Sequence, residues 1–154
     1  MGIITKLTVM HDVALVTLNK VPANVDFISH IFDRLDEAGI NVDMISQSPL
    51  TGAYVSVSFT ASGEEMIKIA ELANTISKEY PSVRPIISHN NAKISLFGET
   101  MPEHHGVAAS VFRVLKDCAT DVLLITTSSV DISVLVNGAS AEACTEALKE
   151  KFEL

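Results

Sequence analysis

The sequence predicts an α+β protein made of two units, each with the order strand–helix–strand–strand–helix–strand. Three observations lead to this prediction. The 154 residues contain an internal repeat, strand-like and helix-like stretches alternate in the same order in both copies, and one strand-like stretch at the N-terminus is left over. Hydrophobic residues make up 47% of the chain, which is enough to bury a packed core.

An internal repeat defines the two units. Four stretches of the first half resemble stretches of the second half at displacements of 77 to 80 positions. The pairs are, in chain order, residues 14–18 with 92–96, 31–35 with 111–115, 42–48 with 122–128, and 55–57 with 132–134. Because the displacement changes only between these stretches, where loops are expected, the sequence predicts two homologous units of roughly 75 residues.

In the first copy, runs of β-branched and apolar residues predict strands, and apolar residues spaced three and four apart predict helices. Gly39 and Pro81 are expected to end the two helices, because glycine tolerates the left-handed conformation and proline cannot continue a helix. The expected elements are a strand at 14–18, a helix at 27–38, strands at 42–46 and 54–60, a helix opened by Ser62 or Gly63, and a strand at 83–88.

The second copy repeats this order but stops before its last strand. Its expected elements are a strand at 93–97, a helix at 106–118, strands at 122–127 and 131–136, and a helix at 141–152. A sheet without its last strand leaves unpaired backbone groups at an open edge. Residues 3–9 are strand-like and have no place in the first copy, so we expect them to complete the second unit. The predicted domains are residues 13–90, and residues 91–154 together with 1–10.

Composition and charge argue against several classes of protein. Lys and Arg number 11 against 19 Asp and Glu, and the net charge of −8 argues against a nucleic-acid surface. No apolar run approaches the ~20 residues that span a bilayer, and the N-terminus lacks the apolar stretch of a signal peptide, so we expect a cytoplasmic protein. Cys118 and Cys144 lack metal-type spacing and lie in apolar helical patterns, so we expect them to be reduced core residues.

Known catalytic motifs are missing from the sequence. It has no Gly-x-x-x-x-Gly-Lys-Ser/Thr loop, no dinucleotide fingerprint and no Gly-x-Ser-x-Gly. The adjacent His104 and His105 precede a helix, and we expect a solvated loop there rather than a metal site. The sequence therefore predicts no catalytic residue, no metal and no cofactor, and it favours a binding or regulatory module.

Four polar residues at the ends of elements in the first unit each have two interpretations. Asp26 either complements the dipole of the helix that starts there or binds a ligand. Asn41 and Asp43 point to the same side of a strand, either as turn formers or as partners for the ammonium and carboxylate of a small zwitterion. Gln47, at the far end of that strand, has the same two interpretations.

Longer motifs in both units resemble those of one known protein family. Residues 38–47 read Ala-Gly-Ile-Asn-Val-Asp-Met-Ile-Ser-Gln, and together with residues 55–60 they resemble the first ACT unit of the regulatory region of aspartate kinase. The second unit agrees at residues 92–98, Met101, 104–109, 125–128 and 132–136. The resemblance covers essentially the whole chain.

The resemblance implies a tandem ACT module in which each unit is ferredoxin-like. Family members bind lysine or threonine as feedback effectors at an interface between ACT units of two chains, which implies a homodimer and association with a catalytic aspartate kinase chain. The chain would then be an amino-acid-sensing module, without the kinase domain, in the aspartate pathway of lysine, threonine and methionine biosynthesis. The alternatives are a ligand-free ACT dimerisation module, a stand-alone amino-acid sensor and, least favoured, a small ferredoxin-like enzyme.

The resemblance also implies an effector site. The candidate residues are Pro22, Ala23, Asp26, Asn41, Asp43, Gln47, Met101, His105, Gly106, Val107, Ala108 and Ser128. Two of them depart from the family in the first unit, because Ala23 and Asp26 stand where it usually has Asp and Gly. In the second unit His105 stands where the family has Pro.

The departure at Asp26 shifts the expected site to the second unit. Asp26 places a negative charge at the helix start that would receive the effector carboxylate, whereas Gly106 leaves the equivalent start open. We therefore expect an effector at the Gly106 start of one unit, facing Asn41 and Gln47 of another. We also expect Asp26→Gly to strengthen or create effector binding.

Overall fold

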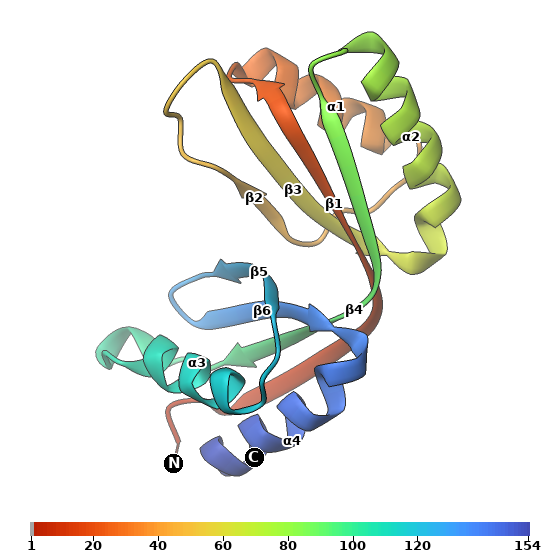
Figure 1. The fold of residues 1–154 in the computed structure, drawn as a ribbon. Coiled ribbons are helices and arrows are strands. Elements are labelled where there is room, and N and C mark those ends of the chain that lie inside the picture. Colours follow the sequence, from red (N-terminus) through yellow and green to blue (C-terminus); the bar gives the residue numbers. More distant parts are fainter. Residues whose placement is uncertain (1) are drawn as a thin grey trace. The chain divides into compact units, whose positions relative to one another are not determined.

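The computed structural model describes residues 2–154, which fold into two units (Figure 1). The central unit is Val13–His89. The terminal unit combines the residues up to Asp12 with Asn90–Leu154. Two long strands, β1 (Lys6–Pro22) and β4 (Arg84–Phe97), each contribute residues to both units.

The central unit is a four-stranded sheet with two helices. Between its parts of β1 and β4 it contains α1 (Val25–Glu37), β2 (Ile45–Gln47), β3 (Tyr54–Ser62), a short 3-10 turn at Gly63–Glu65, and α2 (Met66–Glu79). The strands are ordered β2-β3-β1-β4. Leu18 and Phe59 project from the sheet into a core shared with Ile31 of α1 and Ile69 of α2, and all four side chains are buried. Alternate strand residues and one face of each helix therefore form a single core.

The terminal unit has the same plan. It contains α3 (Val107–Asp117), β5 (Val122–Thr127), β6 (Asp131–Asn137) and α4 (Ala141–Phe152), with 3-10 turns at Met101–Glu103 and Gly138–Ser140. Its sheet is ordered β1-β4-β6-β5. Ile94 and Val134 project from the sheet against Val111 of α3 and Leu148 of α4, all of them fully buried. Each unit is thus a βαββαβ fold of the ferredoxin-like type.

The N-terminal segment completes the terminal unit, as the sequence predicts. Ile4 is 1% exposed and belongs to the core of this unit. The backbone N–H of Thr5 donates to the carbonyl of Phe97 at 2.8 Å, and β1 then continues beside β4. The open edge that the second copy would otherwise leave is therefore paired.

The structure corrects the expected strand boundaries. The sequence predicts separate strands at residues 3–9 and 14–18, but both stretches lie in or next to one strand, β1. Residues 83–88 and 93–97 likewise lie in or next to the single strand β4. Both strands continue through residues with positive φ, Asp12 at 52° and Asn90 at 58°. Asp and Asn adopt this conformation more readily than other non-glycine residues, so the chain bends there and strand pairing resumes.

The strand expected at 42–46 is shorter and later, since β2 covers Ile45–Gln47. Just before it, the N–H of Met44 donates to Oγ1 of Thr60 at 2.9 Å, and the N–H of Asp43 donates to the Thr60 carbonyl at 3.0 Å. A side-chain hydroxyl thus takes one of the positions that a backbone carbonyl would hold in a regular ladder. This irregular pairing delays the start of β2.

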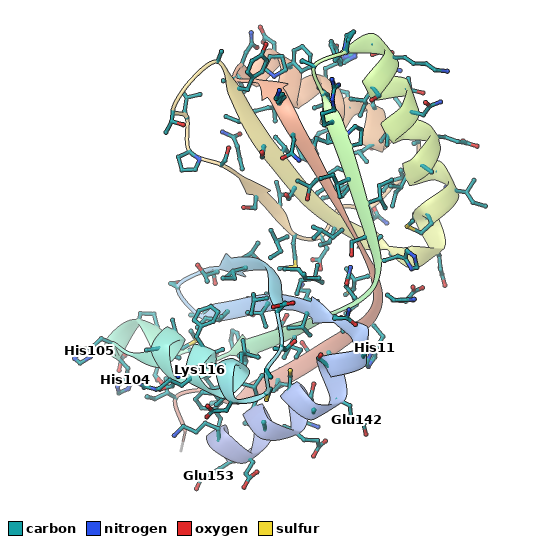
Figure 2. The ribbon with its side chains drawn as sticks, in the orientation of Figure 1. His11, His104, His105, Lys116, Glu142 and Glu153 are labelled. Carbon is teal, nitrogen blue, oxygen red and sulfur yellow. The ribbon has the colours of Figure 1, made fainter. Side chains whose placement is uncertain are left out.

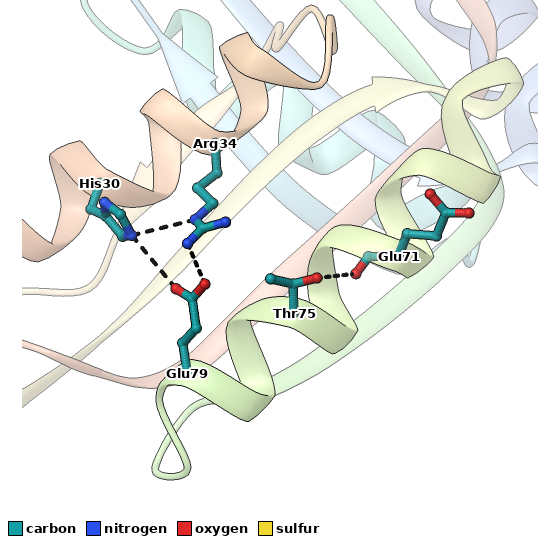
Figure 3. A network of polar contacts seen from close by, with 5 residues as sticks. All are labelled: His30, Arg34, Glu71, Thr75 and Glu79. Carbon is teal, nitrogen blue, oxygen red and sulfur yellow. Dashed lines mark hydrogen bonds and ion pairs between the residues drawn. The ribbon is translucent and has the colours of Figure 1, made fainter.

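A polar network joins the two helices of the central unit (Figure 3). The guanidinium of Arg34 on α1 bonds the carboxylate of Glu79 at the end of α2, and its Nε donates to Nε2 of His30 at 3.3 Å. His30 Nε2 lies 3.6 Å from the second carboxylate oxygen of Glu79. Since Arg34 and Glu79 are each about one-third exposed, this network adds a modest polar contact to the apolar packing of α1 and α2.

The burial of Ile4 gives a direct test of the N-terminal crossover. We expect Ile4→Ala to cost about 2–5 kcal/mol, because it removes a buried side chain and leaves a cavity. Hydrogen exchange should lose more protection in residues 92–154 than in residues 14–88. Leu18→Ala is the matched control, since Leu18 is equally buried but lies in the central unit, and it should show the reverse pattern. Equal losses in both units for Ile4→Ala would contradict the assignment.

Candidate functional site

The two equivalent helix starts differ in how their backbone donors are used. At α1, Asn24 is the N-cap, and its side-chain Oδ1 accepts hydrogen bonds from the N–H groups of Asp26 at 2.8 Å and Phe27 at 3.3 Å. Asp26 itself is exposed in the first turn. This start therefore has both an N-cap and a negative charge, so an incoming carboxylate finds two of the first-turn donors already occupied and an unfavourable potential.

The start of α3 is different. Gly106 is the N-cap, with φ of 86°, a conformation that favours glycine. Within residues 2–154 no side chain caps this turn. Gly106 and Ala108 are exposed, and the first-turn N–H groups of Val107 and Ala108 therefore lie at the positive end of the helix dipole without a side-chain acceptor. Such a turn can receive the carboxylate of a small ligand.

The elements around the α3 start are fixed by a close backbone approach. The N–H of Gly98 donates to the Val130 carbonyl at 2.9 Å, directly after Phe97 pairs with Asp131. A Cβ added at Gly98 would lie 1.9 Å from the carbonyl oxygen of Ile3, so only glycine fits there. The chain then turns through Met101, which is buried and holds the loop that leads to α3.

The other predicted residues of the terminal unit lie at the same end of its sheet. Figure 2 shows His104 and His105 at the N-terminal end of α3, away from Lys116 near the other end of that helix. Both histidines are exposed. Ser128 lies in the turn between β5 and β6, where its Oγ accepts from the N–H of Val130 at 3.2 Å. This turn and the loop into α3 meet beyond the Phe97–Asp131 pair, so the structure groups Met101, His105, Gly106 to Ala108 and Ser128 at one end of the terminal unit.

A hollow of about 390 Å³ opens at this end of the terminal unit. It is lined by Gly2, Ile3, Thr5, Phe97, Glu99, Thr100 and His104. Of the predicted site residues none lines this hollow, but His104 is the direct neighbour of His105. Its lining includes the carboxylate side chain of Glu99, a group of the type that binds an ammonium.

In the central unit the structure separates the predicted residues into two groups. Pro22 pairs with Tyr54 and Gln47 pairs with Val57, so Gln47 lies at the same sheet end as Pro22, Ala23 and Asp26. Asp43 bonds to Thr60, six residues farther along β3 than Tyr54, which corresponds to about 20 Å. Asn41 precedes Asp43 by two residues and is exposed. Asn41 and Asp43 therefore do not lie beside the α1 start of their own unit.

Asn24, the N-cap of α1, is not among the site residues predicted from the sequence. An Asn directly before a helical pattern is an N-cap signal, and it was available in the sequence. The Asn24 cap bears on the expectation that Asp26→Gly strengthens or creates effector binding. Removing the Asp26 charge leaves the Asn24 oxygen on the same two N–H groups, so opening the α1 start requires changing both residues.

The described residues 2–154 hold no cluster of three or more His, Cys, Asp or Glu side chains that could bind a metal ion. In the same residues, no helix is long and apolar enough to cross a membrane.

The Asn24 cap can be measured through stability. We expect Asn24→Ala to lower the free energy of unfolding of the central unit by about 1 kcal/mol, because two first-turn N–H groups lose their acceptor. Urea unfolding measures this change. Asn24→Asp keeps an acceptor oxygen and should stay close to the unchanged protein. A loss for Asp as large as that for Ala would show that the cap does not stabilise α1.

Comparisons with known proteins agree with this geometry. Residues 94–152 match the sequence model of the ACT domain family. The aspartokinase of Corynebacterium efficiens is 29% identical over 155 aligned positions, which cover 99% of this chain. The ligand-free crystal structure of the regulatory subunit of aspartate kinase from Thermus thermophilus superimposes with a TM-score of 0.88 at 26% identity, over 97% of this chain and 99% of that subunit.

A more distant structure shares the fold. Escherichia coli aspartokinase III, solved in complex with lysine and aspartate, superimposes with a TM-score of 0.76 at 23% identity, over 98% of this chain and 33% of that protein. The chain likewise spans only 37% of the length of the Corynebacterium efficiens aspartokinase. Residues 94–152 therefore match the ACT domain family, and over nearly its full length the chain resembles a regulatory subunit of aspartate kinase, which confirms the resemblance and the fold predicted from the sequence.

Proposed function

We propose that this ACT module senses a free amino acid, lysine or threonine, and passes the signal to a catalytic aspartate kinase chain that phosphorylates aspartate with ATP. The observation that carries the proposal is the likeness to the Thermus thermophilus regulatory subunit, which extends over nearly the full length of both chains. The lysine bound by Escherichia coli aspartokinase III supports an amino-acid effector. Regulation then works through differential binding of the effector to two states of the assembled enzyme.

The α3 start is the best-placed receptor for the effector carboxylate. The N–H groups of Val107 and Ala108 lie at the positive end of the helix dipole, and no side-chain cap has to be displaced before they bind a carboxylate. The ammonium needs an acceptor such as a carboxylate or a backbone carbonyl. We propose that one of the two polar groups of a second copy of the chain, either Asn41 with Asp43 or Gln47, supplies this acceptor, so that the effector binds where two chains meet.

A second candidate function is dimerisation without a ligand. The specific observation in its favour is the start of α1, where the Asn24 cap and the Asp26 charge both oppose a carboxylate. The central unit would then serve only to hold chains together. Calorimetry of the purified chain with lysine, threonine and methionine separates the two functions. Binding of any of them supports sensing, and no heat with any of them at millimolar concentration supports dimerisation alone.

The α3 receptor can be tested by adding charge where the carboxylate is expected. We expect Ala108→Glu to weaken effector binding about fivefold, which is about 1 kcal/mol for a like charge in the first turn. Ala108 is exposed and Glu is favourable in the first turn of a helix, so the fold should be retained. Isothermal titration calorimetry measures the affinity. Ala108→Gln has nearly the same shape without the charge and should bind like the unchanged protein, whereas equal weakening by Gln would contradict the electrostatic assignment.

The proposal also predicts a homodimer. Sedimentation equilibrium at tens of micromolar should give twice the chain mass of 16.5 kDa. We expect two-fold symmetry, which is the commonest arrangement of homo-oligomers. A mass of 16.5 kDa under these conditions would count against a site built by two chains, while leaving the fold unaffected.

A further inference from the structure

The terminal unit has a polar hollow on the face of its sheet that is opposite α3 and α4. Ile94 of β4 and Val134 of β6 belong to the core under these helices, so their direct neighbours in each strand project from the opposite face. A hollow of about 360 Å³ opens on that face and is lined by Lys6, Thr8, Ser95, Phe97 and Asp131. These residues come from three neighbouring strands, β1, β4 and β6. The volume falls within the roughly 300–1,000 Å³ of pockets that hold small ligands.

On the β6 side, hydrogen bonds fix which groups can donate into the hollow. Oγ of Ser133, which is only 4% exposed, donates to Oδ1 of Asp131 at 2.8 Å. A serine hydroxyl has one proton, so in the 2.9 Å contact between Ser133 and Ser95 the donor is Ser95. Within residues 2–154 the other carboxylate oxygen of Asp131 has no hydrogen-bond partner. This side of the hollow therefore offers a negative charge and hydrogen-bond acceptors only.

The β1 side of the hollow carries the opposite charge. Lys6 and Thr8 alternate along β1 with two residues that pack on the core, so both project from the face of the hollow. Lys6 is exposed and forms no ion pair with any residue of the described part of the chain. Because β4 lies between β1 and β6, the backbones that carry Lys6 and Asp131 are two strand spacings, or about 10 Å, apart. Two opposite charges thus line one hollow without bonding to each other.

We propose that this hollow binds a free α-amino acid with an uncharged side chain, as a second small-molecule site in each chain. The ammonium donates to Asp131 and Ser95, and the carboxylate accepts from Lys6 and Thr8. The half-buried ring of Phe97, on the strand between them, packs against the ligand side chain. A zwitterion satisfies both charges, whereas a simple anion or cation satisfies one and meets the other as a like charge. The site lies within one chain and uses no N–H group of the α3 start, so it does not depend on the effector site proposed there.

Calorimetry and amide NMR of the full chain test the proposal with L-methionine, whose uncharged side chain makes favourable contacts with aromatic rings. We expect L-methionine to bind, and N-acetyl-L-methionine and L-methioninamide to bind at least about tenfold more weakly, because each lacks one of the two charges. The amide shifts should concentrate at Ser95, Phe97 and Asp131. The proposal is wrong if L-methionine does not bind at millimolar concentration, if the three compounds bind equally, or if the shifts are confined to Val107 and Ala108.

Charge variants separate this site from a general effect of net charge. Asp131→Asn keeps the size and the oxygen that accepts from Ser133, and it should weaken L-methionine binding about tenfold. Asp117→Asn is the matched control, since it removes the same charge from an exposed residue outside the hollow, and it should bind like the unchanged protein. Lys6→Gln changes an exposed side chain and should weaken binding about fivefold even if Asp131→Asn proves unstable. Equal weakening by Asp117→Asn, or unchanged binding by Lys6→Gln, would overturn the proposal.

Discussion

The requirement that strand β4 be paired on both sides organises this molecule. A buried N–H or carbonyl without a partner costs more than a hydrogen bond returns, so a sheet cannot leave an inner strand half paired. In the terminal unit β4 lies between β6 and β1, and the residues on the β1 side come from the start of the chain. The central unit is consequently inserted between two parts of the terminal unit. The same pairing brings the Ile3 carbonyl against Gly98, and this contact fixes the loop from which α3 begins.

The sequence predicts the helices and strands well because each depends on local spacing of apolar residues. It also predicts the crossover, because a missing strand and a spare one can be counted. It does not predict that β1 and β4 are continuous. That depends on Asp12 and Asn90 adopting positive φ, which their side chains permit but do not require. The late start of β2 depends on the hydroxyl of Thr60, which accepts from the N–H of Met44 although the two residues are 16 positions apart. No local sequence pattern predicts a hydrogen bond over this separation.

The candidate site shows a similar limit. The sequence shows that the two helix starts are equivalent and that Asp26 adds a negative charge to one of them. The stronger difference is the Asn24 cap, because its side-chain oxygen already accepts hydrogen bonds from two N–H groups of the first turn. The residues of the terminal unit gather at one sheet end because a strand end, a hairpin turn and a helix start follow one another there. The sequence lists Asn41, Asp43 and Gln47 in one candidate site, and only the register of β2 on β3 and the bond of Asp43 to Thr60 show that Asn41 and Asp43 lie away from the α1 start.

Helix α3 joins the two features that distinguish the terminal unit from its repeat partner. Its first turn begins at a glycine and, within the described chain, its N–H groups have no side-chain cap, while its last turn ends at Cys118, which packs against the core of the terminal unit. In the central unit the matching helix begins at an Asn cap and ends at Ala38, and a polar network adds to its apolar packing against α2. A helix moves as a rigid body more easily than it deforms, so a change in packing at the cysteine end would alter the position of the first turn as well. The duplication thus produced two units with one fold, whose matching helices α1 and α3 differ at both ends.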